Sequence, residues 1–385
     1  MPTDRDIRRA ILHQVWSTFQ RYYPYWDVVD TDWNAAFDTA LRSAATDPHD
    51  DDDEAFTRTL RRFVAALHDG HAAVVHATDL PGLLFVPPLA WDWIEDHLVV
   101  TAGPAPLRPG DVVLEIDGTP AAEALAAEEG LTSAATPHHR RARALATLAA
   151  GRQDTEIRLT LQPAEGLVRT VSLRRSQPAD GSFPATVEII QEIHPGILYV
   201  DLRRATDDDF RNALLHLAVA RGIVFDLRGH PRISKTFLQH LTDQPLDSPH
   251  WDLPVTVGLD GTITWHRSHW TLHPEAPRLR GKLAFLTNGA AISYAETLLG
   301  IVEHYELGAI VGSPTGGTNG NTAWLHLPGG YAIRWTCMRV MKHDGTRHHG
   351  VGIQPTVPVS PTLAGVRAGR DEVLEKAVEV TSRRR

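Results

Sequence analysis

The feature that most constrains the fold is a change of pattern within the stretch from Leu283 to Gly320. An apolar, strand-like run beginning at Leu283 is broken by the turn-forming pair Asn288-Gly289. Apolar residues then recur with helical spacing from Tyr294 onward. The sequence therefore predicts a strand, a turn and a helix, with Ser293 at the N-terminus of the helix.

Two interpretations of Ser293 are open at this point. Unpaired backbone N–H groups and the helix dipole stabilise developing negative charge at a helix N-terminus, so a hydroxyl there can act as a nucleophile. The pattern Ser293-Tyr-Ala-Glu296 also fits a capping box. In that motif the serine and the glutamate satisfy each other's backbone donors and do no chemistry.

Composition places broad limits on what the protein is. A chain of 385 residues is too long for one ordinary core, which favours two or three domains. The net charge of -9, with no local basic stripe, argues against a nucleic-acid partner. No apolar run approaches 18 residues, so we expect no membrane span. The single cysteine, Cys337, and a start without a secretory pattern favour a cytoplasmic protein.

Three segments differ in pattern along the chain. Residues 1–78 carry apolar stripes at helical spacing, for example Ile11, Val15 and Phe19, and predict a small helical bundle. Residues 79–180 carry short β segments separated by turn-formers, with an Ala-rich insertion. Residues 181–385 alternate continuous apolar strands with helices, which predicts an α/β sheet covered on both faces.

Several clusters of metal-binding residue types have a simpler interpretation. The acidic run Asp47 to Glu54 is expected to be a solvated linker. The pairs His138-His139 and His348-His349 lack the further ligands that zinc needs, so they are interpreted as exposed loop histidines. We therefore expect no metal and no cofactor.

Motifs in a specific order connect these segments. They are Leu67-His68-Asp69-Gly70-His71, Phe225 to Pro231, Asn288-Gly289 through Ser293 to Glu296, Gly312 to Gly320, and Gly350-Val351-Gly352-Ile353-Gln354-Pro355. In this order they resemble the C-terminal-processing and tricorn-type serine peptidase family. The resemblance covers nearly the whole chain. It implies a multidomain α/β protein with an N-terminal helical bundle, a PDZ-like β module and a crotonase- or ClpP-like α/β catalytic domain.

The resemblance also implies roles for individual residues. Ser293 is the expected nucleophile. Lysine-type members carry their base 25 positions after the nucleophile, where this chain has Thr318. The chain therefore looks like the tricorn-type branch, in which the histidine of the Asp-Gly-His motif, here His71, is the base.

The remaining site residues are expected from the same comparison. The backbone N–H of Tyr294 is one oxyanion donor, and Gly229 or Arg232 is the candidate for the second. The glycines that relatives carry after the Asp-Leu-Arg motif are missing here, so an impaired oxyanion hole is the other option. The third member of the triad is assigned to Gln354, with Asp344 and Glu296 as alternatives.

The sequence thus predicts a serine hydrolase, a peptidase that cleaves extended peptides or proteins through an acyl-enzyme, with a homo-oligomer as an option. Two alternatives stay open. One is a catalytically impaired member that binds a peptide or an apolar ligand, and the other is a specialised esterase or acyl transferase. We expect residues 80 to 176 to form a separable module that gates access without supplying catalytic groups.

Overall fold

The computed structural model of the chain describes residues 4–46, 53–76, 84–178, 188–257 and 262–383. Contacts divide it into two compact units, which are described separately. The first unit comprises Met1–Phe183 and Asn321–Arg339, and the second comprises Pro184–Gly320 and Val340–Arg385. Asn321–Arg339 thus belongs to the first unit, although the sequence placed it within the segment 181–385. Most of the acidic run after Asp47 lies outside the described residues.

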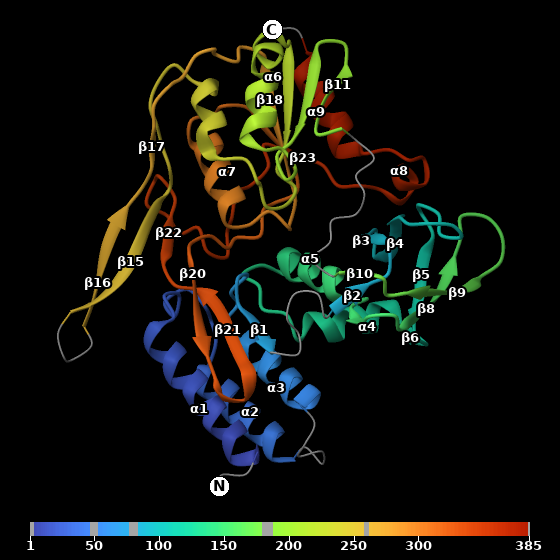
Figure 1. Cartoon of the computed structure of the whole chain (residues 1–385), viewed down its shortest axis with the longest axis vertical. Coiled ribbons are helices and arrows are strands. Elements are labelled where there is room, and N and C mark those ends of the chain that lie inside the picture. The colour runs from blue at the N-terminus through green and yellow to red at the C-terminus, as the bar shows by residue number, and fades with distance from the viewer. Residues whose placement is uncertain (1–3, 47–52, 77–83, 179–187, 258–261, 384–385) are drawn as a thin grey trace. The chain divides into compact units, whose positions relative to one another are not determined.

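The helical stripes near the N-terminus form a bundle in the first unit. Its helices are α1 (Asp4–Tyr22), α2 (Trp33–Thr46) and α3 (Asp53–Ala65). They pack beside a three-stranded sheet of β1 (Ala73–His76), β21 (Tyr331–Thr336) and β20 (Thr322–His326), as Figure 1 shows in blue and orange. The predicted core residue Phe19 is buried against Trp335 of β21. Strand β21 thus shares one hydrophobic core with the N-terminal helices.

The β-rich part of the first unit follows β1. Its main sheet has the order β3-β4-β5-β8-β9, with β6 beside β5. These strands are β3 (Ala90–Ile94), β4 (His97–Ala102), β5 (Val112–Ile116), β6 (Thr119–Pro120), β8 (Glu156–Gln162) and β9 (Arg169–Arg174). The Ala-rich insertion forms α4 (Ala121–Glu129) and α5 (Pro137–Thr147), and a smaller sheet contains β2 (Leu84–Val86), β7 (Gly151–Arg152) and β10 (Gln177–Pro178).

A six-stranded, mostly parallel sheet organises the second unit, in the order β11-β12-β13-β18-β19-β23. Its strands are β11 (Ile190–His194), β12 (Ile197–Asp201), β13 (Gly222–Asp226), β18 (Lys282–Thr287), β19 (Ala309–Gly312) and β23 (Val357–Pro358). Strands β12 and β13 are buried at every position. This agrees with the continuous apolar runs, because a parallel sheet is covered on both faces.

Alternate residues of these strands enter two different cores. Leu198, Phe225 and Phe285 pack with α6 (Asp207–Val219), α7 (Tyr294–His304) and the 3-10 helix η2 (Lys235–Leu241). Tyr199, Val224 and Ala284 pack instead with α9 (Glu372–Ser382). This two-sided packing fixes the carboxyl ends of the parallel strands, where ligands bind in open α/β sheets.

Smaller elements complete the second unit. They are the hairpin of β15 (His250–Val257) and β16 (Thr262–Ser268), β22 (Arg339–Met341) beside β15, the pair β14 (Leu246–Asp247) and β17 (Thr271–Leu272), and the short helix α8 (Leu363–Arg367). Within the described ranges, no helix combines the length and the apolar character needed to cross a membrane.

Candidate active site

Ser293 lies where β18 turns into α7, and its backbone is strained. Its φ is 57° and its ψ is -120°, a region that favours glycine, and its side chain makes no capping hydrogen bond. Its backbone N–H donates to Thr318 O at 2.7 Å rather than to Glu296. The capping-box interpretation is therefore wrong. Strain of this kind costs about 1–3 kcal/mol and persists only where the surroundings impose it.

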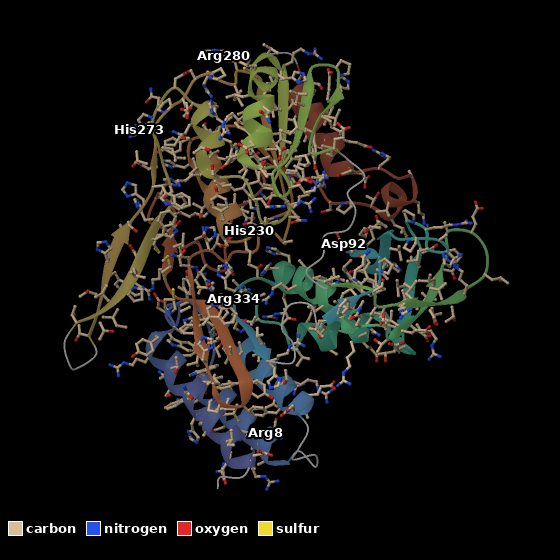
Figure 2. The ribbon with its side chains drawn as sticks, in the orientation of Figure 1. Arg8, Asp92, His230, His273, Arg280 and Arg334 are labelled. Carbon is tan, nitrogen blue, oxygen red and sulfur yellow. The ribbon has the colours of Figure 1, made fainter. Side chains whose placement is uncertain are left out.

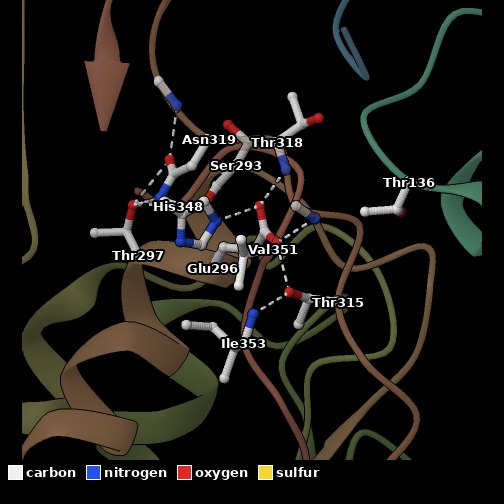
Figure 3. A network of polar contacts seen from close by, with 12 residues as sticks. Thr136, Ser293, Glu296, Thr297, Thr315, Thr318, Asn319, His348, Val351 and Ile353 are labelled. Atoms are coloured by element: carbon white, nitrogen blue, oxygen red, sulfur yellow. Dashed lines mark hydrogen bonds and ion pairs between the residues drawn. The ribbon is translucent and has the colours of Figure 1, made fainter. Parts of the chain in front are cut away.

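The surroundings that impose this geometry are the loop Thr315 to Asn319, shown in Figure 3. Besides the bond from Ser293, the N–H of Gly316 donates to Ala291 O at 2.8 Å. Asn319 is joined side chain to side chain with Thr297 of α7 at 3.0 Å. The loop where lysine-type relatives place their base is thus folded against the start of α7.

Glu296 holds the same loop from inside the protein. Its Oε1 accepts from the Thr315 hydroxyl at 2.5 Å and from the N–H of Gly317 at 2.7 Å. Its Oε2 accepts from the N–H of Thr318 at 2.9 Å and lies 3.0 Å from Nε2 of His348. Burial by itself would raise the pKa of the Glu296 carboxyl, but the His348 imidazole and these donors outweigh burial and lower that pKa.

The candidate oxyanion donors have different environments. Tyr294 is the first residue of α7, and a first-turn N–H has no acceptor within its own helix. Gly229 has a positive φ of 139°, a conformation that glycine adopts readily. Its N–H, however, donates to Leu227 O at 2.7 Å. The N–H of Arg232 donates to Leu202 O at 2.9 Å. Both candidates for the second donor therefore already have acceptors. Between them lies His230, labelled in Figure 2, whose ring is 6.0 Å from that of Tyr294.

His71 lies in the first unit, in the turn between α3 and β1, and is buried. Its Nδ1 is 2.9 Å from Oγ1 of Thr336 on β21. The Thr336 hydroxyl donates to Asp69 Oδ1 at 2.6 Å, and the Thr336 N–H donates to Asp69 Oδ2 at 2.7 Å. Because the only hydroxyl proton of Thr336 goes to Asp69, its oxygen accepts from Nδ1–H of His71. In the neutral imidazole this arrangement leaves the lone pair on Nε2, as a general base requires.

The β-rich part of the first unit also holds this turn. Nη1 of Arg143 on α5 donates to Gly70 O at 2.8 Å and to Ala72 O at 3.1 Å, on either side of His71. The Asp69 N–H donates to the Ser133 hydroxyl at 3.0 Å. Arg334 of β21, labelled in Figure 2, donates to His71 O at 3.2 Å. Arg143 and Ser133, both from the β-rich part, thus contact the turn that carries His71.

The residues considered as third triad member have other partners. Gln354 is exposed and donates from Nε2 to Val351 O at 2.8 Å. Asp344 is exposed and accepts from the N–H and hydroxyl of Thr346. Glu296 accepts from the loop described above. The groups that hold Nδ1 of His71 in the structure are Thr336 and, behind it, Asp69, to which the sequence analysis gave no role.

The histidine pairs are not the exposed loop residues that the sequence indicated. His348 is 1% exposed, His349 4% and His139 3%. His139 lies on α5, and His348 and His349 lie in the segment between β22 and β23. In the described part of the chain, no cluster of three or more His, Cys, Asp or Glu residues is arranged to hold a metal ion.

Comparison with known proteins agrees with the mixed α/β multidomain fold. The chain is similar to mature CPAF complexed with lactacystin, with a TM-score of 0.78, 15% identity and coverage of 98% of both chains. It is similar to a putative peptidase from Parabacteroides merdae ATCC 43184, with a TM-score of 0.60, 16% identity and coverage of 100% of this chain and 98% of that chain. The photosystem II D1 C-terminal processing protease gives a TM-score of 0.50 at 19% identity, covering 95% and 98% of the two chains. No curated protein matches the chain by sequence.

These similarities place the protein among chains with the fold of known proteases. Residues 196–359 match the model of peptidase family S41, so this part of the chain is an S41 family domain of the C-terminal-processing and tricorn-like kind. The family resemblance seen in the sequence is thereby confirmed. This match supports a peptidase function acting on peptides or proteins. The matched residues include Ser293 but not His71.

Proposed function

We propose that the protein is a serine peptidase that cleaves extended peptide or protein substrates through an acyl-enzyme. The observation that carries this proposal is the strained backbone of Ser293 at the mouth of α7, with a side chain that makes no capping bond. A serine kept only for helix stability would use that bond, which is worth about 1 kcal/mol. Strain without capping is instead typical of a functional residue.

In the proposed reaction His71 is the base. Its Nε2 takes the proton of the Ser293 hydroxyl as the serine oxygen attacks the scissile carbonyl carbon, and returns the proton to the leaving amine. Water then attacks the acyl-enzyme with the same base and releases Ser293. The Tyr294 N–H stabilises the oxyanion. Thr336 and Asp69, rather than Gln354, take the role of orienting the imidazole, because they hold Nδ1.

A fluorophosphonate probe tests whether Ser293 is activated, because only an activated serine reacts with it. We expect labelling of the wild type at Ser293 and no labelling of Ser293→Ala. If the folded wild type stays unlabelled, the protein is the binding module with an impaired oxyanion hole. That alternative draws support from the occupied N–H groups of Gly229 and Arg232.

A panel of substrates separates peptidase from esterase activity. We expect hydrolysis of unfolded proteins and of extended peptides. Hydrolysis of small esters alone would favour the esterase or acyl transferase. We also propose that residues 84–178 form the PDZ-like module and take up the extended chain, since such modules add a peptide to a sheet edge. The single cysteine is compatible with a cytoplasmic location.

A further inference from the structure

A buried carboxylate–imidazole pair lies one helical turn from the proposed nucleophile. Glu296 is 0% exposed and His348 is 1% exposed, and Oε2 of Glu296 is 3.0 Å from Nε2 of His348. Burying a carboxylate costs several kcal/mol unless its oxygens are well satisfied. The four contacts of Glu296 meet this requirement, and they include no lysine or arginine.

The contacts of Glu296 converge on a single loop. Two of them come from consecutive backbone N–H groups, those of Gly317 and Thr318. A third comes from Thr315, whose Oγ1 also accepts the N–H of Ile353 at 2.8 Å. The carboxylate therefore fixes the loop both directly and through the segment that follows His348.

The loop in turn fixes Ser293. The carbonyl of Thr318 accepts the N–H of Ser293, and the N–H of Gly316 binds the carbonyl of Ala291, two residues before the serine. Both bonds hold the connection in which Ser293 has its φ of 57°. A continuous path thus runs from the Glu296–His348 pair, through the backbone N–H and carbonyl of Thr318, to the backbone of the nucleophile.

From this path we infer that Glu296 and His348 are positioning residues that hold the Thr315–Thr318 loop, and through it keep Ser293 in its reactive backbone conformation. The inference rests on the proposed function, because it presumes that Ser293 is the nucleophile. It assigns a catalytic purpose to a glutamate that the sequence suggested as a cap and to a histidine that it suggested was exposed. The pair acts on the geometry of the serine and does not itself touch the substrate.

The shape of the site makes Glu296→Gln a sharp test. A glutamine side chain has the same size, but one of its two polar ends is an NH₂ group that cannot accept. Whichever way the amide is placed, it faces the N–H of Gly317 or of Thr318 as a second donor. One bond to the loop is therefore lost.

Substitutions of His348 test the other half of the pair. His348→Gln offers a neutral N–H near the position of Nε2 and should keep the bond to Glu296. His348→Leu fills similar space without any donor and leaves the buried carboxylate one partner short. The matched control is Glu303→Gln, on the same helix, whose partly exposed carboxylate pairs with Lys342 at 3.1 Å.

The measurements are kcat, KM and the rate constant for fluorophosphonate labelling, taken well below each variant's melting temperature. We expect Glu296→Gln and His348→Leu to lower kcat and the labelling rate on the order of a hundredfold, as a displacement near 1 Å can do, with KM nearly unchanged. His348→Gln and Glu303→Gln should stay within a few fold of the wild type. If Glu296→Gln does not fold, the comparison of His348→Leu with His348→Gln decides the question.

Two failures are distinguishable. An unlabelled wild type would remove the proposed function and this inference with it. If the wild type is labelled at Ser293 and folded Glu296→Gln or His348→Leu reacts at the same rate, the pair has only a structural role and the inference is overturned.

Discussion

Thr336 accepts a hydrogen bond from Nδ1 of His71 at 2.9 Å while donating its own proton to Asp69 at 2.6 Å. The carboxylate thereby determines, through one hydroxyl, which imidazole nitrogen carries the proton. In serine peptidases that task falls to an acid bound directly to the imidazole. Here the threonine lies between them, and the two hydrogen-bonded side chains, His71 and Thr336, are 265 residues apart in the sequence.

Replacement of Thr336 tests this arrangement. Thr336→Val keeps the shape but removes the acceptor, so the proton can move to Nε2, and we expect kcat/KM to fall roughly tenfold to a hundredfold. Thr336→Ser should keep most of the activity, and Thr322→Val, at the exposed start of β20, should change little. Steady-state kinetics on a peptide substrate measure all three. Full activity of Thr336→Val would mean that another group orients the base.

Substitutions of Ser293 separate strain from chemistry. Ser293→Ala should abolish hydrolysis with little change in melting temperature, because the serine side chain makes no capping bond. Ser293→Gly should be equally inactive but more stable than Ser293→Ala by about 1 kcal/mol, since glycine adopts positive φ without penalty. Activity assays and thermal unfolding test both. An active Ser293→Ala variant would place the nucleophile elsewhere.

The pH profile tests the identity of the base. With His71 as base, kcat/KM should rise with pH over the range in which an imidazole loses its proton, roughly 6 to 7. A lysine base would more often place the rise above about 7 to 8. His71→Ala should lower the rate about a thousandfold or more and flatten this limb.

His216→Ala, at an exposed position of α6, is the control for that experiment. If kcat/KM of His71→Ala still rises with pH over the same range, a different residue is the base. The tricorn-type assignment would then be wrong.

Arg143 links the β-rich part of the first unit to the turn that carries the proposed base, His71. Burial lowers the pKa of its guanidinium to about 10, and the group donates to the carbonyls on both sides of His71. A lysine at this position is shorter and lacks the fork of donors, so Arg143→Lys should lower kcat about tenfold and destabilise the fold by about 1–3 kcal/mol. Arg141→Lys is the matched control, since Arg141 is on the same helix and pairs with Glu129 at the surface. Equal kinetics for the two variants would contradict the link.

The lowered pKa of Glu296 predicts a dependence of stability on acid. Because the folded state holds this pKa below its ordinary value of 4.5, the ionised carboxylate stabilises the fold above that value. The contribution is lost as the pH falls through the lowered pKa. The difference in the free energy of unfolding between wild type and Glu296→Gln should therefore be largest above pH about 5 and shrink below about 4. A difference that does not vary with pH would show that the carboxylate is not ionised in the fold.

The sequence by itself determined the local features of this protein. The apolar runs became β12, β13, β18 and β19, because a strand buried on both faces needs continuous apolar side chains. The break at Asn288-Gly289 placed Ser293 at the start of α7. The ordered motifs identified the family, which the match over residues 196–359 confirmed.

Only the tertiary structure decided which groups surround Ser293 and His71. A capping box is a local pattern, and the sequence around Glu296 fits it. In the structure, the Glu296 carboxylate instead accepts from three donors of the Thr315–Thr318 loop and contacts His348. Thr336, Arg143 and His348 carry no sequence signal, because their partners are brought to them by the packing of strands and helices distant along the chain. Spacing along a sequence governs contacts within a turn or a helix, whereas the polar partners of a buried group are set by which segments share a core.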